Sequence, residues 1–365
     1  MDTEKETETL DTEYMDTDTP DIITDEDESL SPAYDTSESD EENKIPVAQQ
    51  LVLLVAILLL LLGGSLTPTI TAFFQDTADT IPAAPAYIEA QDHTTSKREE
   101  SDSIIPFSEV SIIGKAAYVW DVQSQRALYK KDSSEQLPLA SVTKLMTALV
   151  AHELLTENSE VTISDQAIRQ DGDSGLLQGE TFNRATLSDL VLMSSSNDGA
   201  FAMAAAAGGL LEKDNPANAF VNAMNIRAEE LNLHDTYFKN PTGLDISKEE
   251  GGAYGSAKDM AFLMEHIVIH QPDLLAFTQE DQTRLYSQDG IYHDAVNTNY
   301  YIDEIPGLIG SKTGYTDLAG GNLIIAFDAG LNRPIIISVL GSTRHERFTD
   351  VMSLVEEVQR YVTRQ

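Results

Sequence analysis

A long uncharged stretch divides this chain into two unequal parts and limits what each of them can fold into. No Asp, Glu, Lys or Arg occurs between Ile45 and Gln75, and residues 51–62 are apolar without interruption. An apolar segment of this length can cross the hydrocarbon core of a bilayer as a helix. The segment before it is long and acidic, whereas a signal peptide begins with a short basic region. We therefore predict an uncleaved transmembrane anchor over residues 47–74, with a cleaved signal peptide as the alternative.

The segment that precedes this stretch is strongly acidic. Residues 1–46 contain 18 Asp and Glu against Lys5 and Lys44, which leaves a net charge of −16. Such a segment cannot bury enough apolar surface to offset the entropy lost on ordering, so we predict a disordered tail. Lys and Arg favour the cytoplasmic side of a membrane, and on the other flank the first of them is Lys97. This comparison predicts a single-pass protein of the cell membrane with a cytoplasmic N-terminus and an extracytoplasmic remainder.

The chain after the uncharged stretch changes character once more. Residues 75–108 show no helical or strand period and include Pro82 and Pro85 among many Asp, Thr and Ser residues. This composition is typical of a linker. Residues 109–365 then read as one compact domain, which is long enough to bury a sizeable core.

The composition of the whole chain excludes several classes of function. The 365 residues carry a net charge of −38 and include no cysteine. The negative charge argues against nucleic acid as a partner, because nucleic acid needs a positive protein surface. Without cysteine the chain can form neither a disulfide, a thiolate nucleophile nor a cysteine-based zinc site.

Hydrophobic periodicity within residues 109–365 predicts a mixed α/β (α+β) domain. Strand-like runs occur near its two ends, at residues 115–121, 126–129, 310–314, 322–327 and 334–340. Helical patterns lie between these runs and close the chain, at residues 141–154, 186–194, 197–207, 216–231, 256–270 and 346–361. Because strands come from both ends of the domain, we expect one antiparallel sheet completed by both chain ends, with helices packed on it.

The helix predicted to begin at Ser141 brings together two chemically useful side chains. Residues three apart share a face of a helix, so Ser141 and Lys144 can meet without help from the rest of the fold. A serine at a helix start also lies beside unpaired backbone N–H groups. A hydroxyl, an amine and free N–H donors are three parts of a covalent acyl-transfer site. Alone, Ser-x-x-Lys is a weak signal, and a helix cap followed by a surface lysine is the more common explanation of it.

Two further polar motifs follow, Ser195-x-Asn197 and Lys312-Thr313-Gly314. In this order the three motifs resemble those of the peptidoglycan acyl-transferases, the penicillin-binding proteins and class A β-lactamases. The flanking residues are similar to those of the low-molecular-mass D-alanyl-D-alanine carboxypeptidases at residues 138–147, 193–200, 238–244 and 310–320.

The resemblance extends from about residue 108 to the C-terminus. It implies the β-lactamase/transpeptidase-like fold and a serine-type carboxypeptidase that acts on peptidoglycan stem peptides ending in D-Ala-D-Ala. It also implies covalent inhibition by β-lactams. Many members of the family carry a C-terminal amphipathic anchor, and here we expect the N-terminal span to take its place.

The chemistry of acyl transfer suggests a role for each polar side chain. Ser141 is expected to be the nucleophile and Lys144 its general base, because the chain has no Ser/His/Asp signature such as Gly-x-Ser-x-Gly. Lys144 can act as a base only if it is partly neutral, and burial beside the cation Lys312 would lower its pKa in that direction. We expect Ser195 to relay a proton between Lys144 and the leaving group. Asn197 is expected to bond Lys144 and the substrate amide.

The resemblance also implies how substrate is held. Lys312 and Thr313 are expected to bind the substrate carboxylate, and Gly314 to let the substrate backbone approach closely. The oxyanion would be bound by the backbone N–H groups of the nucleophile and of Tyr315. An arginine near the last helix is expected for the terminal carboxylate, with Arg347 preferred to Arg344. The implied substrate-binding residues are Lys312, Thr313, Gly314, Tyr315 and Arg347.

Three rival functions stay open at this point. A β-lactamase is disfavoured because Ser196 stands where those enzymes usually have Asp, and because Ala228 interrupts their Glu-x-x-Leu-Asn motif. A D,D-endopeptidase on the same scaffold would carry the same motifs, and the intact motifs argue against an inactive wall-binding module. His266 and His270 have metal-ligand spacing, but no Glu follows the first His, so neither a metal nor a cofactor is expected.

Overall fold

The computed structural model describes residue 107 and residues 110–364. The predicted acidic tail, the predicted anchor at residues 47–74 and all of the predicted linker except Phe107 lie outside this range. Within the described part of the chain, no helix has both the length and the apolar character needed to cross a bilayer. The anchor therefore stays a prediction from the sequence.

A five-stranded sheet forms the centre of the domain. Its strands are β1 (Ala116–Asp121), β2 (Arg126–Lys131), β10 (Leu308–Thr316), β11 (Gly320–Asp328) and β12 (Pro334–Ser342). The spatial order is β10-β11-β12-β1-β2, and each neighbouring pair is antiparallel. The two ends of the domain meet where β1 pairs with β12, with Ala116 opposite Leu340. The predicted antiparallel sheet completed by both chain ends is confirmed.

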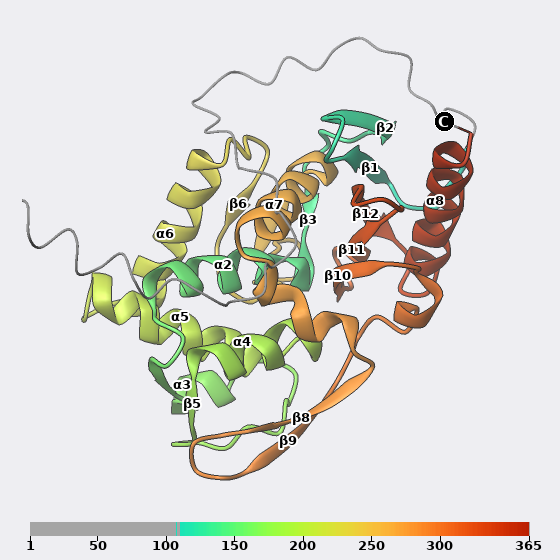
Figure 1. Ribbon diagram of the computed structural model, residues 1–365. Coiled ribbons are helices and arrows are strands. Elements are labelled where there is room, and N and C mark those ends of the chain that lie inside the picture. The colour runs from blue at the N-terminus through green and yellow to red at the C-terminus, as the bar shows by residue number, and fades with distance from the viewer. Residues whose placement is uncertain (1–106, 108–109, 365) are drawn as a thin grey trace, which may run out of the picture. The chain divides into compact units, whose positions relative to one another are not determined.

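Helices cover both faces of this sheet (Figure 1). On one face, α8 (Glu346–Val362) packs against side chains that include Leu323 and Ile337. On the other, α7 (Ala257–His270) packs where Ile324 and Ile336 point, because neighbouring residues of a strand face opposite sides. The remaining helices are η1 (Ala140–Thr143), α2 (Lys144–Leu154), α3 (Asp165–Ile168), α4 (Arg184–Met193), α5 (Asn197–Leu211), α6 (Pro216–Glu230), η2 (Pro272–Gln279) and η3 (Ile302–Glu304).

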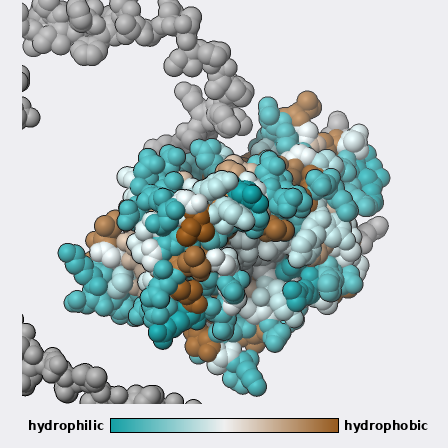
Figure 2. All heavy atoms as spheres, turned by 90° about the horizontal axis from the view of Figure 1, so that it is seen from below, coloured by the Kyte–Doolittle hydropathy of each residue, from teal (hydrophilic) through white to brown (hydrophobic). Residues whose placement is uncertain are grey.

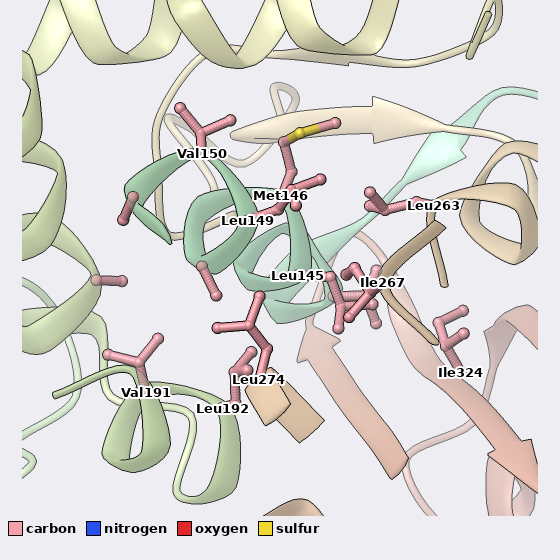
Figure 3. Packing of buried hydrophobic residues seen from close by; sticks show 14 of the residues in the cluster. Leu145, Met146, Leu149, Val150, Val191, Leu192, Leu263, Ile267, Leu274 and Ile324 are labelled. Atoms are coloured by element: carbon pink, nitrogen blue, oxygen red, sulfur yellow. The ribbon is translucent and has the colours of Figure 1, made fainter. Parts of the chain in front are cut away.

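Helix α2 lies in the centre of the larger hydrophobic core. Figure 3 shows its Leu145 and Leu149 among side chains from α7, α4 and the sheet, including Ile267, Leu192 and Ile324. A helix that is apolar on all sides is stable only when it is surrounded by other elements. The buried residues of α2 include its first residue, the lysine at position 144. The hydrophobic sequence of α2 thus carries a lysine side chain into the interior.

Short strands complete the fold, and the sequence analysis did not predict them. They form β3 (Leu137–Pro138), β7 (Ala253–Gly255) and β6 (Tyr237–Phe238) in one small sheet, the pair β4 (Glu160–Thr162) and β5 (Thr181–Asn183), and the hairpin β8 (Gln282–Tyr286) and β9 (Tyr292–Val296).

The β8–β9 hairpin lies below α4 in Figure 1 and contacts that helix. Its outward side chains include Tyr286 and Tyr292, which face each other across the two strands. Hydrophilic residues cover most of the face seen from below, and hydrophobic residues form a narrow stripe across it (Figure 2). The inner side of the hairpin buries Leu285, His293 and Ala295.

Candidate active site

Ser141 lies in the short 3-10 helix η1, whereas the sequence predicted the first turn of an α-helix. The preceding residue, Ala140, has φ of +48°, a left-handed conformation that is uncommon outside glycine. Gly243 packs directly on this turn, since a Cβ added to it would lie 1.9 Å from the carbonyl oxygen of Ala140. A non-glycine residue keeps this conformation only where neighbouring residues hold it. The packing of Gly243 on Ala140 therefore helps to fix the position of Ser141, whose side chain is half-buried.

The ammonium group of Lys144 lies at the centre of the site. Its Nζ donates to Ser141 Oγ at 2.9 Å, to Asn197 Oδ1 at 2.6 Å and to the carbonyl oxygen of Thr242 at 2.8 Å. Burial lowers the pKa of Lys144 well below that of an ordinary lysine, and the nearby cation Lys312 lowers it further. Both causes are those expected from the sequence. A neutral Lys144 in contact with the Ser141 hydroxyl is therefore accessible.

The carbonyl oxygen of Thr242, which accepts a hydrogen bond from Lys144, belongs to a loop that we did not predict to take part in the site. Asn240 Oδ1 accepts hydrogen bonds from the backbone N–H groups of Thr242, at 3.2 Å, and Gly243, at 2.7 Å. Thr147 on α2 donates to the carbonyl oxygen of Pro241 at 2.6 Å. Its Asn-Pro-Thr-Gly sequence is a turn signature, which predicts a turn but not the contact with Lys144. The loop presents a backbone acceptor to Lys144, which residue types alone do not reveal.

Ser195 and Asn197 lie at the junction of α4 and α5. Asn197 bonds Lys144 as expected, but its Nδ2 donates to the carbonyl oxygen of Asp171 at 2.6 Å. Ser195 has a left-handed φ of +64°, and its Oγ accepts a hydrogen bond from Lys312 Nζ at 2.9 Å. The Ser195 hydroxyl therefore lies against Lys312, whereas we expected it to exchange a proton with Lys144.

Lys312 and Thr313 lie on β10, opposite the helical side of the site. The Nζ of Lys312 also donates to the carbonyl oxygen of Thr313 at 2.9 Å, and the side chain is 1% exposed. Burial, followed by the positive charge of Arg347, lowers the pKa of Lys312 to about 7. The Thr313 hydroxyl hydrogen-bonds that of Thr298 at 2.6 Å. Thr298 is a further polar group at this position that the motifs did not indicate.

Gly314 lies against the turn that carries the nucleophile. A Cβ added to Gly314 would lie 2.9 Å from the carbonyl oxygen of Leu139 and 3.1 Å from the backbone nitrogen of Ser141. The missing side chain leaves room for this turn, and the expected approach of the substrate backbone at Gly314 stays a prediction. Because Tyr315 is the next residue of β10, the two expected oxyanion donors belong to segments that touch each other.

Arg347 lies behind β10, at the start of α8. Its Nη1 donates to the carbonyl oxygen of Gly314 at 2.7 Å, and its Nε has no hydrogen-bond partner among the described residues. Burial and then the charge of Arg344 lower the pKa of Arg347 to about 10. The guanidinium of Arg344 lies over the ring of Tyr315, 5.2 Å from its centre. Arg347 is 6% exposed and contacts β10 at Gly314, so its expected contact with the terminal carboxylate of the substrate stays a prediction.

The two histidines with metal-ligand spacing lie elsewhere, on α7. Arg227 Nη2 is 3.3 Å from His266 Nε2, and the two imidazole rings are 4.6 Å apart. Burial, the neighbouring His270 and Arg227 lower the pKa of His266 to about 4. In the part of the chain that the structure describes, no three His, Asp or Glu side chains are grouped as a metal site would require.

The polar motifs predicted from the sequence thus meet in one place. They supply a hydroxyl bonded to a buried lysine, a second serine bonded to a second buried lysine, and backbone N–H groups beside the nucleophile. This arrangement can activate a serine, bind an anion and stabilise a tetrahedral intermediate without a cofactor.

Comparisons with known proteins agree with this chemistry. The model of the D-alanyl-D-alanine carboxypeptidase family matches residues 104–344. The carboxypeptidase DacF of Bacillus subtilis is 33% identical over 255 residues, which cover 68% of this chain and 63% of DacF. A D-alanyl-D-alanine endopeptidase of Pseudomonas aeruginosa is 30% identical over 66% of this chain and 75% of its own. Penicillin-binding protein D2 of Listeria monocytogenes, solved with ampicillin bound, superposes with a TM-score of 0.58 at 27% identity, covering 69% of this chain and 98% of that one.

Proposed function

The chain belongs to the D-alanyl-D-alanine carboxypeptidase family of serine hydrolases, and we propose that it removes the terminal D-Ala from peptidoglycan stem peptides. The observation that supports this most is the 2.9 Å contact between Lys144 Nζ and Ser141 Oγ in a buried site. Because a lysine whose pKa is lowered can accept a proton, this contact joins a nucleophile to its base.

The acylation step follows from the positions of these groups. Neutral Lys144 accepts the Ser141 proton while Oγ attacks the carbonyl carbon of the penultimate D-Ala. The backbone N–H groups of Ser141 and Tyr315 hold the oxyanion, and the bond to the terminal D-Ala then breaks. The leaving amine takes a proton from the hydroxyl of Ser195, and the proton that Lys144 accepted from Ser141 finally replaces it, so that both lysines return to their starting charge. Water hydrolyses the acyl-enzyme, with Lys144 again accepting a proton.

Substrate is held from the β10 side. The charged form of Lys312 and the hydroxyl of Thr313 bind the terminal carboxylate, which a penicillin also carries. A bound carboxylate raises the pKa of Lys312 from its value of about 7 in the free protein, since it stabilises the charged form. Arg347 adds positive charge from behind the strand through its contact with Gly314.

An endopeptidase that cuts cross-links is the second candidate, because a relative named as an endopeptidase matches nearly as well as the carboxypeptidase. Incubation of the full-length protein with purified muropeptides separates the two by mass analysis. A carboxypeptidase shortens monomeric pentapeptide stems by one alanine and leaves cross-linked dimers intact. We expect this result. Conversion of dimers to monomers without loss of terminal alanine would instead support the endopeptidase.

We also propose that the protein is anchored in the cell membrane with the catalytic domain outside. Support comes from the uncharged apolar segment and from the lysines before it. Intact cells stripped of their wall should lose the domain to added protease, while an N-terminal tag on the acidic tail stays protected. A mature N-terminus between Thr67 and Gln75 would show that the apolar run is a cleaved signal.

A further inference from the structure

The side chain of Asn322 makes three hydrogen bonds in the interior of the domain. Its Nδ2 donates to the carbonyl oxygens of Pro138, at 3.0 Å, and Leu139, at 2.9 Å. Its Oδ1 accepts from the backbone N–H of Gly341 at 2.8 Å. A carboxamide has two N–H donors and one carbonyl acceptor, so every polar atom of this side chain is engaged. The bonds at its two ends together determine the orientation of the amide.

The position of Asn322 in the sheet places it beside the nucleophile. In the β10–β11 pairing, Asn322 lies directly opposite Gly314. Side chains of directly opposed residues lie on the same face of a sheet. The absent side chain of Gly314 leaves room for the segment from Leu139 to Ser141, and Asn322 holds that segment from the neighbouring strand.

The third bond connects the same segment to β12. Gly341 has φ of +67°, and the β11–β12 pairing shifts register between Gly321 and Leu323. The N–H of Gly341 at this irregularity bonds to the Asn322 side chain. Residues that precede Ser141 are therefore connected through one amide to two strands of the central sheet.

The turn next to Asn322 needs such support. Ala140 holds a left-handed φ of +48° one residue before the nucleophile, and a non-glycine residue keeps this conformation only where its surroundings hold it. Rotation about this residue would change the direction of the Ser141 N–H. The N–H of Tyr315, on the continuous strand β10, would stay in place.

We propose that Asn322 is a positioning residue for acylation, which holds the carbonyls of Pro138 and Leu139 so that the N–H groups of Ser141 and Tyr315 converge on one oxyanion. This inference rests on the proposed function. Donors to a developing oxyanion act only at the correct distance, and a shift of about 1 Å at a reacting group costs roughly a hundredfold in rate. Ground-state binding of the substrate carboxylate uses other groups, on β10.

The test separates the rate of acylation from binding. Full-length protein is mixed with a fluorescent penicillin over a range of concentrations, and the maximal acylation rate constant is obtained separately from the apparent Kd. We expect Asn322→Ala to lower the maximal rate constant roughly 10- to 100-fold, with a change in Kd below about threefold. Asn322→Ser adds no charge, and its single shorter hydroxyl cannot bond both carbonyls and the N–H of Gly341 at once, so it should be slowed similarly. The serine variant also decides the question if the alanine variant does not fold.

Asn225 provides a matched control. Its Nδ2 donates to the carbonyl oxygens of Val221 and Phe238, and its Oδ1 accepts from the N–H of Phe238. Asn225→Ala therefore removes an equivalent set of hydrogen bonds and should lower the Tm without slowing acylation more than about threefold.

If the wild type reacts with penicillin, three results would contradict the role of Asn322 without contradicting the proposed function. They are an Asn322 variant that acylates at the wild-type rate, a loss confined to Kd, and an equal slowing in Asn225→Ala. A wild-type protein that forms no adduct would overturn the proposed function and this inference with it.

Discussion

The Ser141→Ala variant is expected to form no covalent adduct with penicillin, a loss of about 10⁴-fold or more in the rate of acylation. A β-lactam presents its strained amide to the same hydroxyl that attacks the peptide, and alanine offers no atom for the new bond. Lys144 keeps its acceptors on Asn197 and Thr242 in the variant, so the site should stay assembled. Intact-mass analysis after incubation with penicillin measures the adduct directly.

A remote serine provides the control for this variant. Ser353 is an exposed residue of α8 whose hydroxyl bonds the carbonyl oxygen of Thr349, so Ser353→Ala removes a serine without touching the site. It should label like the wild type. Labelling of Ser141→Ala at the wild-type level would exclude Ser141 as the nucleophile, and peptide mapping of the adduct would then identify the residue that reacts.

The long elements of the fold could be predicted because their hydrophobic patterns are strong. The helix expected at residues 216–231 is observed at Pro216–Glu230, and the strand expected at residues 334–340 is observed at Pro334–Ser342. The order of strands and helices then restricted the topology, since strands from both chain ends can share one sheet.

The shorter strands are a different case. The two-residue strands Leu137–Pro138 and Tyr237–Phe238 exist through their pairing with β7, a contact between distant parts of the chain. The β8–β9 hairpin did have a local signal, because Asp289-Gly290 lies between two runs of alternating polarity.

The candidate site shows a similar division. Motifs indicated which side chains take part, because acyl transfer needs particular functional groups. They did not indicate that Ser195 bonds Lys312 rather than Lys144, or that Gly314 admits the nucleophile turn. Asn322 escaped notice for a related reason. It acts on backbone carbonyls 183 and 184 positions away in the chain, and no local pattern records such a contact.

The two buried lysines should respond differently to replacement by arginine. Lys144 must lose its charge to accept the Ser141 proton, and a guanidinium does not deprotonate in proteins. Lys144→Arg should therefore lower the acylation rate constant by about 10³-fold or more, because an arginine stays charged and cannot accept the Ser141 proton. Lys312 acts through its positive charge, which arginine keeps, so Lys312→Arg should retain measurable acylation. Both replacements enlarge a fully buried side chain, so a purely steric effect would not distinguish them.

The pH dependence of the second-order acylation rate constant tests the same assignment in the wild type. Reaction needs neutral Lys144, whose fraction falls as pH decreases through its lowered pKa, and charged Lys312, whose fraction falls as pH rises through about 7. The profile should therefore decline above about pH 7. In Lys312→Arg this decline should disappear, because the arginine stays charged.

The measurement that tests both assignments is the acylation rate constant of the wild type and the two variants with one penicillin across pH. Equal residual rates in the two variants would exclude Lys144 as the base, and a decline that persists in Lys312→Arg would assign it to another group.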